Sequence, residues 1–252
     1  MSGNKTVIII AGPTAVGKTA LGIDAAQYFQ AEIISADSRQ CYKELNIGVA
    51  RPSPEELAVV PHHFIASHSI EEKVTAASFE QYALEKAADL FQMHDVIVMV
   101  GGTGLYIKAF CEGLDEVPEV PEEVRAQIIH NFQQHGLEWL QQEVQTRDPR
   151  FFAVGEIQNP HRLMRALEVV MSTSQSILDF RTGIKKQRPF NIIKIALDLP
   201  REQLHYNINT RVDKMIEQGL VEEVRAVLPY RDHSALQTVG YKEIFSYLEG
   251  EI

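Results

Sequence analysis

The stretch AGPTAVGKTA, residues 11–20, constrains the fold of this chain more than any other part of its sequence. It has the spacing of a phosphate-binding loop, in which four residues separate Gly12 from Gly17-Lys18-Thr19. The two glycines let the backbone turn its N–H groups inward around phosphate oxygens. Lys18 supplies a positive charge, and Thr19 offers a hydroxyl to Mg²⁺. The pattern therefore predicts a bound diphosphate group, without indicating which molecule carries it.

Strand and helix patterns alternate around this loop. Short apolar runs predict strands inside a sheet, because residues covered on both faces are continuously apolar. The expected strands are residues 6–11, 32–35, 95–100 and 191–199, and the expected helices are residues 18–29, 78–93, 124–148, 160–173 and 201–218. Strands that alternate with helices predict an α/β fold, here a P-loop kinase-like parallel sheet flanked by helices on both faces.

Local signals suggest the apolar side of the first helix and the start of the second. In the first helix, Leu21, Ala25 and Tyr28 share one side. In the second, Ser78 and Gln81 have the spacing of a capping box. We therefore expect the first helix to pack through Leu21 and the second to begin at Ser78.

The organisation changes near residue 112. The stretch EGLDEVPEVPEEV, residues 112–124, holds two prolines and six acidic residues and no basic one, which is typical of a linker or domain edge. Helical patterns continue beyond it without a strand until residue 191. We therefore expect an all-helical insertion domain at residues 113–187, between the two parts of one α/β core at residues 1–112 and 188–252.

Composition is that of an ordinary globular protein, with 45% apolar and 23% charged residues. Cys41 and Cys111 lack the spacing of a disulfide framework or a zinc site, so a reducing compartment fits. The short N-terminal apolar run leads directly into the phosphate loop, unlike a signal peptide, and no run approaches the roughly 20 apolar residues of a membrane span. We therefore expect a cytoplasmic protein with no membrane contact. The net charge of −10 argues against binding nucleic acid through bulk charge.

Three loops follow the expected strands at the edge where parallel sheets bind ligands: residues 12–19, 36–40 and 101–104. Asp37 lies in the second loop, where a carboxylate can accept a proton from an incoming nucleophile. Capping of the next segment, or holding a metal-bound water, is an equally open role for it. Thr103, in the third loop, lies at the same edge, and its alternative role is to cap a following helix.

Two adjacent histidines, His62 and His63, invite a metal-binding interpretation. Adjacent residues on an extended segment point to opposite faces, so they do not easily share one ion. We expect packing or hydrogen-bonding roles for both.

The strand at residues 96–100 lacks a residue that nucleotide hydrolases usually need. In those enzymes an acid at the end of a second apolar strand holds Mg²⁺. Here the run VIVMV ends in glycines instead. The phosphate site therefore favours a leaving group over the γ-phosphate of ATP.

Six segments, taken in order, resemble tRNA dimethylallyltransferases, also called tRNA isopentenyltransferases. They are GPTAVGKTALGI, IISADSRQCYKELNIGVARPSPEE, VPHHFI, VMVGGTGLYIKA, NPHRLMRALEV and VGYKEIFSYLEGEI. The resemblance runs from about residue 8 to the last residue, and the SADS-Q-Y and GGTGLY segments are highly specific in combination with the loop. Family members usually continue with a basic helix, and eukaryotic ones add a zinc finger. The chain therefore resembles a bacterial, C-terminally shortened member.

The resemblance implies a reaction. A dimethylallyl group passes from dimethylallyl diphosphate to N6 of the adenine immediately 3′ of the anticodon, in tRNAs that read codons beginning with U. Diphosphate leaves, and Mg²⁺ assists. The implied catalytic residues are Asp37 as the base on N6, Thr103 near the same amine, and Lys18 and Arg211 at the diphosphate. The implied donor-binding residues are Gly12, Thr14, Ala15, Val16, Gly17, Lys18 and Thr19, and Thr19 is also the implied magnesium ligand.

The resemblance also implies how a monomer of this kind binds the anticodon stem-loop of tRNA, with the target adenine extruded into a channel. The implied tRNA contacts are Asp37, Ser38, Arg39, Gln40, Thr103, Arg125, His161, Arg162 and Arg165. A basic zone between residues 161 and 188 agrees, with Arg162, Arg165, Arg181, Lys185, Lys186 and Arg188 against two acids. Charge runs alone usually mark a solvated helix face. His161 and Asn207 depart from the family, which commonly has Gln and Arg at these positions.

Two other functions are compatible with the residues. A P-loop kinase of a small metabolite would use Asp37 to activate a substrate hydroxyl and would consume ATP without RNA. A non-catalytic P-loop protein would bind RNA and nucleotide without turnover. An Asn-Lys-x-Asp segment that reads guanine is absent from the sequence, which argues against a GTP switch.

Overall fold

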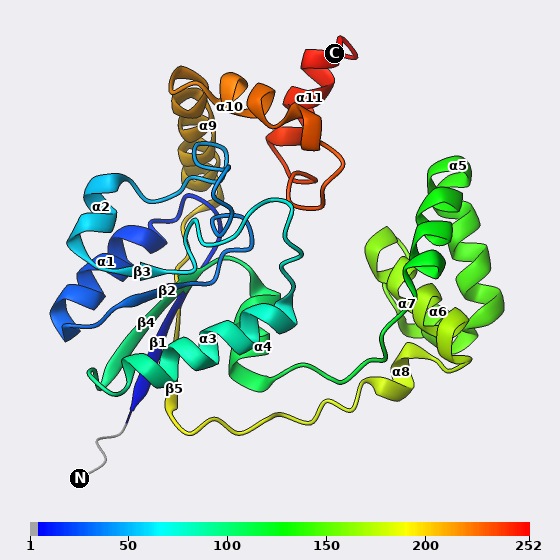
Figure 1. Cartoon of the computed structure of the whole chain (residues 1–252), viewed down its shortest axis with the longest axis horizontal. Helices are drawn as coiled ribbons and strands as arrows, with labels where there is room; N and C mark the ends of the chain where they lie inside the picture. The colour runs from blue at the N-terminus through cyan, green and yellow to red at the C-terminus, as the bar shows by residue number, and fades with distance from the viewer. Residues whose placement is uncertain (1–4) are drawn as a thin grey trace. The chain divides into compact units, whose positions relative to one another are not determined.

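The computed structural model describes residues 5–252, and the chain divides into two compact units. One combines the residues up to 113 with residues 186–252, and the other is residues 114–185 (Figure 1). We call them the α/β unit and the helical unit. The boundaries expected from the sequence, 113 and 187, lie within two residues of this division.

The α/β unit is built on a five-stranded parallel sheet with the order β3-β2-β4-β1-β5. The strands are β1 (Thr6–Ala11), β2 (Ile33–Ser35), β3 (His62–His63), β4 (Val96–Gly101) and β5 (Asn191–Ala196). Ala11 at the end of β1 pairs with Gly101 on one side and Ala196 on the other. The loops after these strands therefore emerge at one edge of the sheet.

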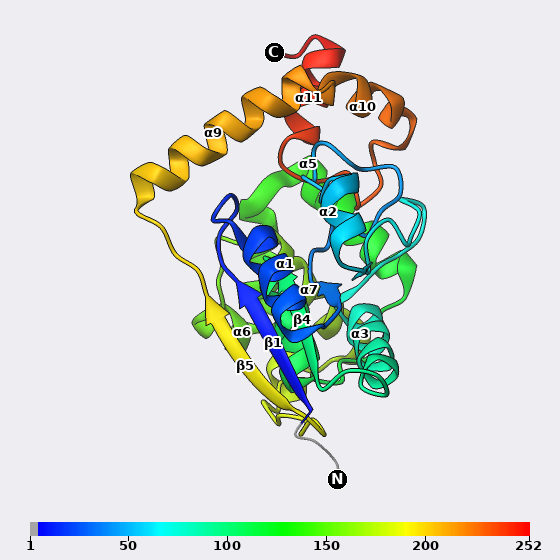
Figure 2. The ribbon, with the colours of Figure 1, turned by 90° about the vertical axis from the view of Figure 1, so that its left-hand side faces the viewer.

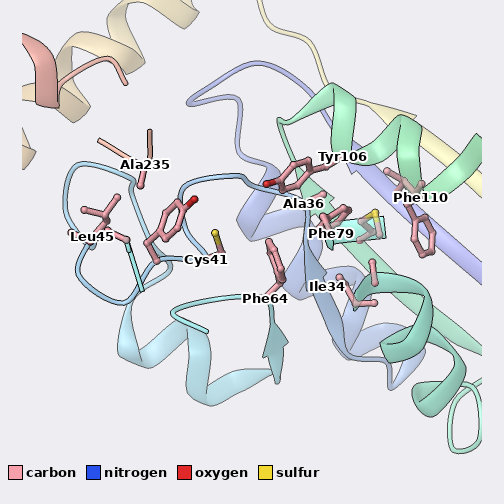
Figure 3. Packing of buried hydrophobic residues seen from close by; sticks show 14 of the residues in the cluster. Ile34, Ala36, Cys41, Leu45, Phe64, Phe79, Tyr106, Phe110 and Ala235 are labelled. Carbon is pink, nitrogen blue, oxygen red and sulfur yellow. The ribbon is translucent and has the colours of Figure 1, made fainter. Parts of the chain in front are cut away.

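Helices cover both faces of the sheet, as the alternating sequence pattern predicted. On one face, α1 (Lys18–Phe29) buries Ile23 and Ala26 against Ile8 and Ile10 of β1. On the other, α3 (Ala76–Leu90) and α4 (Gly104–Glu112) pack against the alternate residues of the same strands. Figure 3 shows this second layer, in which the rings of Phe79 and Tyr106 stack with centroids 4.4 Å apart.

The chain after β5 forms α9 (Arg201–Glu217), α10 (Leu220–Ala226), a short 3-10 helix (Leu228–Tyr230) and α11 (Tyr241–Glu249). Figure 2 shows α9 leading from the end of β5 to α10 and α11. Side chains of α10 and α11 join the same apolar cluster as Tyr42 and Leu45, which lie in the loop after β2. A short helix, α2 (Pro54–Val59), follows that loop.

The helical unit contains α5 (Glu122–Arg147), α6 (Pro149–Val154), α7 (Pro160–Thr173) and α8 (Ile177–Phe180). Leu140 and Val144 of α5 pack against Leu163 and Leu167 of α7. Gly136 interrupts α5 with a non-helical backbone, φ 71° and ψ −165°. The unit therefore has an apolar core of its own.

The predicted apolar side of α1 was wrong for Leu21 and Tyr28, whereas Ala25 is partly buried and packs against the core cluster as expected. Leu21 is 37% exposed and Tyr28 is 82% exposed, whereas the buried residues are Gly22, Ile23 and Ala26. A Cβ atom at Gly22 would lie 2.4 Å from Val100 Cγ2, so the helix approaches the sheet through its smallest residue. Close packing, rather than the position of the largest apolar residues, decides which face of α1 is buried.

The predicted start of α3 was also wrong. Thr75 is the N-cap, and its capping box partner is Ser78, which lies at the third helical position. The Thr75 hydroxyl accepts from Ser78 N at 3.1 Å. Gln81 instead donates to Glu85 Oε1, one turn further on. The helix begins earlier because Thr75 can satisfy the free N–H groups of its first turn.

The strand at residues 191–196 exists, but it is not buried as predicted. It is one of the two edge strands of the sheet, and Ile193 and Ile195 are 51% and 39% exposed. Apolar residues predominate in it, as in a central strand, although Lys194 interrupts the run, so the prediction did not distinguish the two positions. Among residues 5–252, no helix has both the length and the apolar character to cross a bilayer.

Candidate active site

A pocket opens at the carboxyl edge of the sheet, within the α/β unit. The start of α1 contributes Lys18 and Thr19 to its lining, the segment around the end of β2 contributes Asp37 and Gln40, and β4 contributes Gly101. The three loops expected at this edge therefore meet as the parallel topology requires.

The phosphate loop has a backbone that requires its glycines. Gly12 has φ 155°, and a Cβ atom there would lie 2.7 Å from the carbonyl oxygen of Leu197. Gly17 has φ 97° and immediately precedes α1, whose N-terminus no side chain of the described residues caps. The first N–H groups of α1 are therefore suited to an anion, which the helix dipole also favours.

Three charged side chains interact electrostatically near this loop. Lys18 Nζ donates to the carbonyl oxygens of Gly12 and Pro13 at 2.9 and 2.7 Å. Burial lowers the pKa of Lys18, the carboxylate of Asp37 opposes that shift, and the guanidinium of Arg211 adds to it. Burial likewise lowers the pKa of Arg211, again opposed by Asp37. The two cations and the carboxylate are close enough to influence one another's charge.

Asp37 caps the turn that follows it. Its Oδ1 accepts the backbone N–H groups of Arg39 and Gln40 at 2.8 and 3.2 Å. Asp37 therefore has the capping role that the sequence left open for it. This role occupies one carboxylate oxygen, and the same side chain lines the pocket, so the cap is compatible with a role as base.

Thr103 stands at the N-cap position of α4, but its hydroxyl does not cap the helix. It accepts the backbone N–H of Ser38 at 3.0 Å and donates to Ser38 Oγ at 3.3 Å. The loop after β4 is thus joined to the loop after β2, and Thr103 lies next to the residue that follows Asp37.

Arg39 and Gln40 use their side chains inside the protein. Arg39 Nη1 donates to the carbonyl oxygen of Ser234 at 2.9 Å. Gln40 Nε2 donates to the carbonyl oxygens of Val49 and Ala50 at 3.2 and 2.9 Å. Both side chains therefore hold the Asp37 loop against other segments of the α/β unit.

Helix α9 reaches the phosphate loop through Asn207. Its Nδ2 donates to the carbonyl oxygen of Ala15 at 3.1 Å. Ala15 has φ 63°, a left-handed conformation that this bond helps to hold. Asn207 and Arg211 are one helical turn apart and share one side of α9. Asn207 therefore contacts the phosphate loop directly from α9.

Two predicted tRNA contacts of the helical unit, Arg125 and Arg165, bind the same carboxylate. Arg125 Nε lies 3.0 Å from Glu168 Oε1, and Arg165 Nη1 lies 3.1 Å from Glu168 Oε2. Glu168 is buried, so its negative charge holds both guanidinium groups in place. His161 and Arg162 are exposed on the first turn of α7, and Arg162 pairs with Glu156.

Arg188 does not belong to the predicted basic zone. It lies in the α/β unit, where its Nη2 donates to Glu80 Oε1 and to the carbonyl oxygen of Ala109, both at 2.8 Å. Its side chain is 9% exposed. The linear charge pattern placed it beside Lys185 and Lys186, but in the fold its side chain is largely buried and makes structural contacts.

The donor atoms at the pocket suit a magnesium ion that is bound mainly by a phosphate ligand. Among residues 5–252, no group of three or more His, Cys, Asp or Glu side chains could hold a metal ion. Thr19 offers one hydroxyl in the pocket that Asp37 also lines. Mg²⁺ commonly keeps several waters and takes few protein ligands beside substrate phosphates. The residues therefore fit an ion that arrives with its diphosphate.

The sequence missed that His62 lines this pocket. Its Nδ1 hydrogen-bonds to the carbonyl oxygen of Val60 at 2.8 Å, and burial lowers its pKa, which favours the neutral ring. His63 bonds instead to Glu32 Oε2 at 2.6 Å. The expected hydrogen-bonding roles are confirmed, and the alternation of side chains along β3 was the signal that one of the two must face the pocket.

Comparison with known proteins identifies close relatives. A family model described as IPP transferase matches residues 40–252. The tRNA dimethylallyltransferase of Cytophaga hutchinsonii is 47% identical over 98% of this chain and 81% of its own length. The tRNA dimethylallyltransferase 1 of Bacteroides thetaiotaomicron is 45% identical over 98% of this chain and 80% of its own. The structure of the tRNA isopentenylpyrophosphate transferase of Bacillus halodurans is similar with a TM-score of 0.68 and 32% identity, over 98% of this chain and 78% of that one.

Proposed function

Because this chain belongs to the family of tRNA dimethylallyltransferases, we propose that it transfers a dimethylallyl group from dimethylallyl diphosphate to an adenine of tRNA. The acceptor is N6 of the adenine immediately 3′ of the anticodon, in tRNAs that read codons beginning with U. The observation that carries the proposal is that Lys18 and Asp37 line one pocket beside the phosphate loop, with the Arg211 guanidinium near enough to interact electrostatically with Lys18 and Asp37. The two cations can stabilise the negative charge of a leaving diphosphate, and the carboxylate can accept a proton from an amine.

The donor half of the reaction belongs to the phosphate loop and α9. The C1–O bond of the donor breaks, and its electron pair leaves with the diphosphate. The N–H groups at the start of α1, together with Lys18 and Arg211, stabilise that negative charge. Lys18 Nζ now bonds to carbonyl oxygens of its own loop, and it exchanges one of them for a phosphate oxygen when the donor binds.

The acceptor half belongs to the loops after β2 and β4. C1 of the dimethylallyl group bonds to N6, and the N6 proton passes to the oxygen of Asp37 that does not cap the turn. Thr103 lies beside Ser38, where its hydroxyl can orient the same amine. General base catalysis of this kind contributes about 10²–10⁴-fold in rate.

We propose that Mg²⁺ is bound by the Thr19 hydroxyl and the diphosphate oxygens. When bound, it neutralises charge on the leaving group. Asp37 is then not needed as a metal ligand and can act on the acceptor amine. Its Oδ1 already bonds to Arg39 and Gln40.

We propose that the anticodon stem-loop contacts the exposed His161 and Arg162 of the helical unit and the half-buried Arg125 and Arg165. Glu168 holds the last two in fixed positions, which reduces the entropy lost on binding a phosphate. Asp37, Ser38, Arg39 and Gln40 are the contacts on the α/β unit. We propose that the chain does this as a cytoplasmic monomer.

The relatives do not favour the metabolite kinase alternative, since their names describe prenyl transfer to tRNA. A direct test incubates the chain with unmodified tRNA and Mg²⁺, together with either dimethylallyl diphosphate or ATP. Nucleosides from the digested tRNA are then identified by mass. Dimethylallyl-adenosine formed without ATP supports the proposal, and ATP-dependent phosphorylation of a metabolite without any prenylated nucleoside contradicts it.

Two variants sharpen this test. Lys18→Ala removes a cation from the leaving group, so product formation is expected to fall at least ~10²-fold. Lys108→Ala removes an exposed cation of α4 outside the pocket and serves as its matched control. Equal losses in both variants would contradict a specific role for Lys18.

A further inference from the structure

The Glu223 carboxylate of α10 binds three consecutive backbone N–H groups. Its Oε2 accepts from Asn46 and Ile47 at 3.1 and 2.8 Å, and its Oε1 accepts from Gly48 at 3.0 Å. Successive N–H groups converge on one point when the backbone curls into a concave arrangement that favours an anion. Here a side chain from far along the sequence supplies that anion, and residues 46–48 are held to α10 by it.

Tyr241 completes the arrangement from α11. Its hydroxyl donates to Glu223 Oε1 at 2.5 Å, and the residue is fully buried. Burial, together with the Glu223 carboxylate, raises the pKa of Tyr241, so its hydroxyl stays a donor at any physiological pH. A Cβ atom at Gly48 would lie 2.6 Å from the Tyr241 ring. The glycine therefore lets the backbone reach both the ring and the carboxylate.

Hydrogen bonds continue from this anchored segment to Asp37. The carbonyl oxygens of Val49 and Ala50, which directly follow Gly48, accept from the side chain of Gln40. The backbone N–H of Gln40 in turn donates to Asp37 Oδ1 at 3.2 Å. Glu223 is thus joined to the proposed base through one loop and one side chain, all within the α/β unit.

Two more contacts hold the same loop. Arg51 Nη2 donates to the carbonyl oxygens of Tyr42 and Lys43 at 2.7 and 3.1 Å, and also to that of Leu45. Its positive charge is offset by the Glu223 carboxylate, which opposes the lowering of the pKa of Arg51 by burial. Figure 3 shows Leu45 on the side of the cluster where Ala235 lies. The loop is therefore anchored to the C-terminal helices by charge, hydrogen bonds and apolar packing together.

We propose that Glu223 is a positioning residue for the transfer reaction, holding residues 46–50 so that Gln40 and Asp37 face the acceptor amine. The proposal rests on the proposed function, because it assigns the loop to the acceptor half. It predicts that loss of Glu223 affects the two substrates differently. The donor binds through the phosphate loop, which Glu223 does not touch, so loss of Glu223 affects the acceptor step and spares donor binding.

The test compares Glu223→Gln with Glu222→Gln, its exposed neighbour on α10. The amide introduced by Glu223→Gln retains one oxygen but places an NH₂ group among N–H donors, where it cannot accept. We expect kcat to fall about 10–100-fold and the KM for dimethylallyl diphosphate to stay within about twofold. Glu222→Gln should behave as the unmodified chain. Tyr241→Phe, which keeps the ring packing and removes one hydrogen bond, should lower kcat by a smaller factor.

All variants are compared at a temperature where circular dichroism reports a fully folded chain. An unchanged kcat for folded Glu223→Gln overturns the proposal, and so does a KM for the donor that rises as much as kcat falls. If Glu223→Gln does not fold, folded Tyr241→Phe decides by the same two criteria.

Hydrogen exchange separates this proposal from the function itself. The amides of residues 46–50 should exchange at least about tenfold faster in Glu223→Gln, or in Tyr241→Phe, than in Glu222→Gln. Unchanged exchange overturns the positioning role, whether or not the chain transfers a prenyl group. Absence of transfer by the unmodified chain, by contrast, refutes the proposed function.

Discussion

At the scale of single residues, Asp37 combines a structural role with the chemical role that we propose for it. One of its oxygens holds the backbone turn through Arg39 and Gln40, and the side chain lies in the pocket with Lys18. The cap fixes the orientation of the carboxylate, so little conformational freedom remains to be lost when the acceptor binds. A base that is held by its own loop is preorganised for the reaction.

Asp37→Asn separates the two roles. The asparagine keeps an oxygen that can accept from Arg39 and Gln40, but it cannot take a proton from N6. We expect kcat to fall by about 10²–10⁴-fold while the dissociation constant for the donor changes less than about twofold. Steady-state kinetics and donor titration measure the two quantities. Turnover close to that of the unmodified chain would remove Asp37 from the mechanism.

Cys41 illustrates how burial controls reactivity. Burial, followed by the nearby Asp37 carboxylate, raises the pKa of its thiol to about 12. At pH 8, on the order of one molecule in ten thousand has Cys41 in the thiolate form. We therefore expect no alkylation of Cys41 by iodoacetamide in the folded chain. Mass spectrometry of the treated protein measures this, and urea-unfolded protein, in which the thiol reacts, is the control. Rapid labelling of folded protein at Cys41 would contradict the prediction.

The raised pKa of the Cys41 thiol also makes the stability of the folded chain depend on pH. Folding raises the thiol pKa above its ordinary value of 9.0, so the folded state favours the protonated form. This contribution is present below about pH 9 and is lost as the pH rises toward 12.

At the scale of secondary structure elements, turns and breaks depend on contacts that can be named. Glu223 of α10 binds the loop after β2, which also packs against side chains of α11. Asn207 of α9 binds the phosphate loop, and Thr103 joins the loops after β2 and β4. In the helical unit, α5 is broken at Gly136 so that its second half packs on α7. These features depend on single residues, which makes them testable.

Gly136→Ala should destabilise the helical unit. Its φ of 71° with ψ of −165° is a combination that residues with a Cβ atom rarely adopt. We expect a loss of about 1–3 kcal/mol in the free energy of unfolding. Urea titration followed by the fluorescence of Trp139, the one tryptophan of the chain, measures it. Gln134→Ala, an exposed change nearby in α5, should alter stability by less than about 0.5 kcal/mol, and equal losses in both variants would contradict the prediction.

Arg165→Ala tests the proposed tRNA surface of α7. Removing a cation that contacts a phosphate should weaken tRNA binding and reduce the salt slope of log K by about one. Binding is measured at several salt concentrations, with Arg150→Ala as the control. Arg150 is also ion-paired, with Asp179 at 2.8 Å, but it is not a predicted tRNA contact. A salt slope that Arg165→Ala leaves unchanged would identify Arg165 as an ordinary ion-paired surface residue.

At the scale of the whole molecule, the chain consists of two units with separate apolar clusters. The α/β unit carries the phosphate loop and Asp37, and the helical unit carries Arg125 and Arg165. Because the helical unit is an insertion, the chain passes between the units twice, near residues 113 and 186. Ligands of the pocket should therefore stabilise one unit more directly than the other.

Inorganic diphosphate with Mg²⁺ provides the measurement. At about 100 times its dissociation constant, a ligand adds about 2.7 kcal/mol to the stability of the folded state that binds it. We expect far-UV circular dichroism to report a higher urea midpoint, with a smaller shift in the Trp139 fluorescence that follows the helical unit. Coincident shifts of both signals would indicate that the units unfold together. No shift at all would contradict diphosphate binding.

The sequence by itself determined the features that depend on near neighbours. The phosphate loop, the extent of α1 and β1, and the helical character of residues 124–148 and 160–173 follow from local spacing, because glycine conformation and apolar periodicity act over a few residues. The family resemblance added candidate roles for Asp37, Thr103 and Arg211, which spacing alone left open.

Only the tertiary structure decided what depends on distant segments. It placed β5 at an exposed edge, turned Arg188 inward to Glu80, and brought Glu223 to residues 46–48. None of these can be read from neighbouring residues, because burial and charge pairing are set by segments far away along the chain. A carboxylate or an apolar face is stabilised by the groups that surround it in space. Only the tertiary fold brings those groups together, because they lie far apart in the sequence.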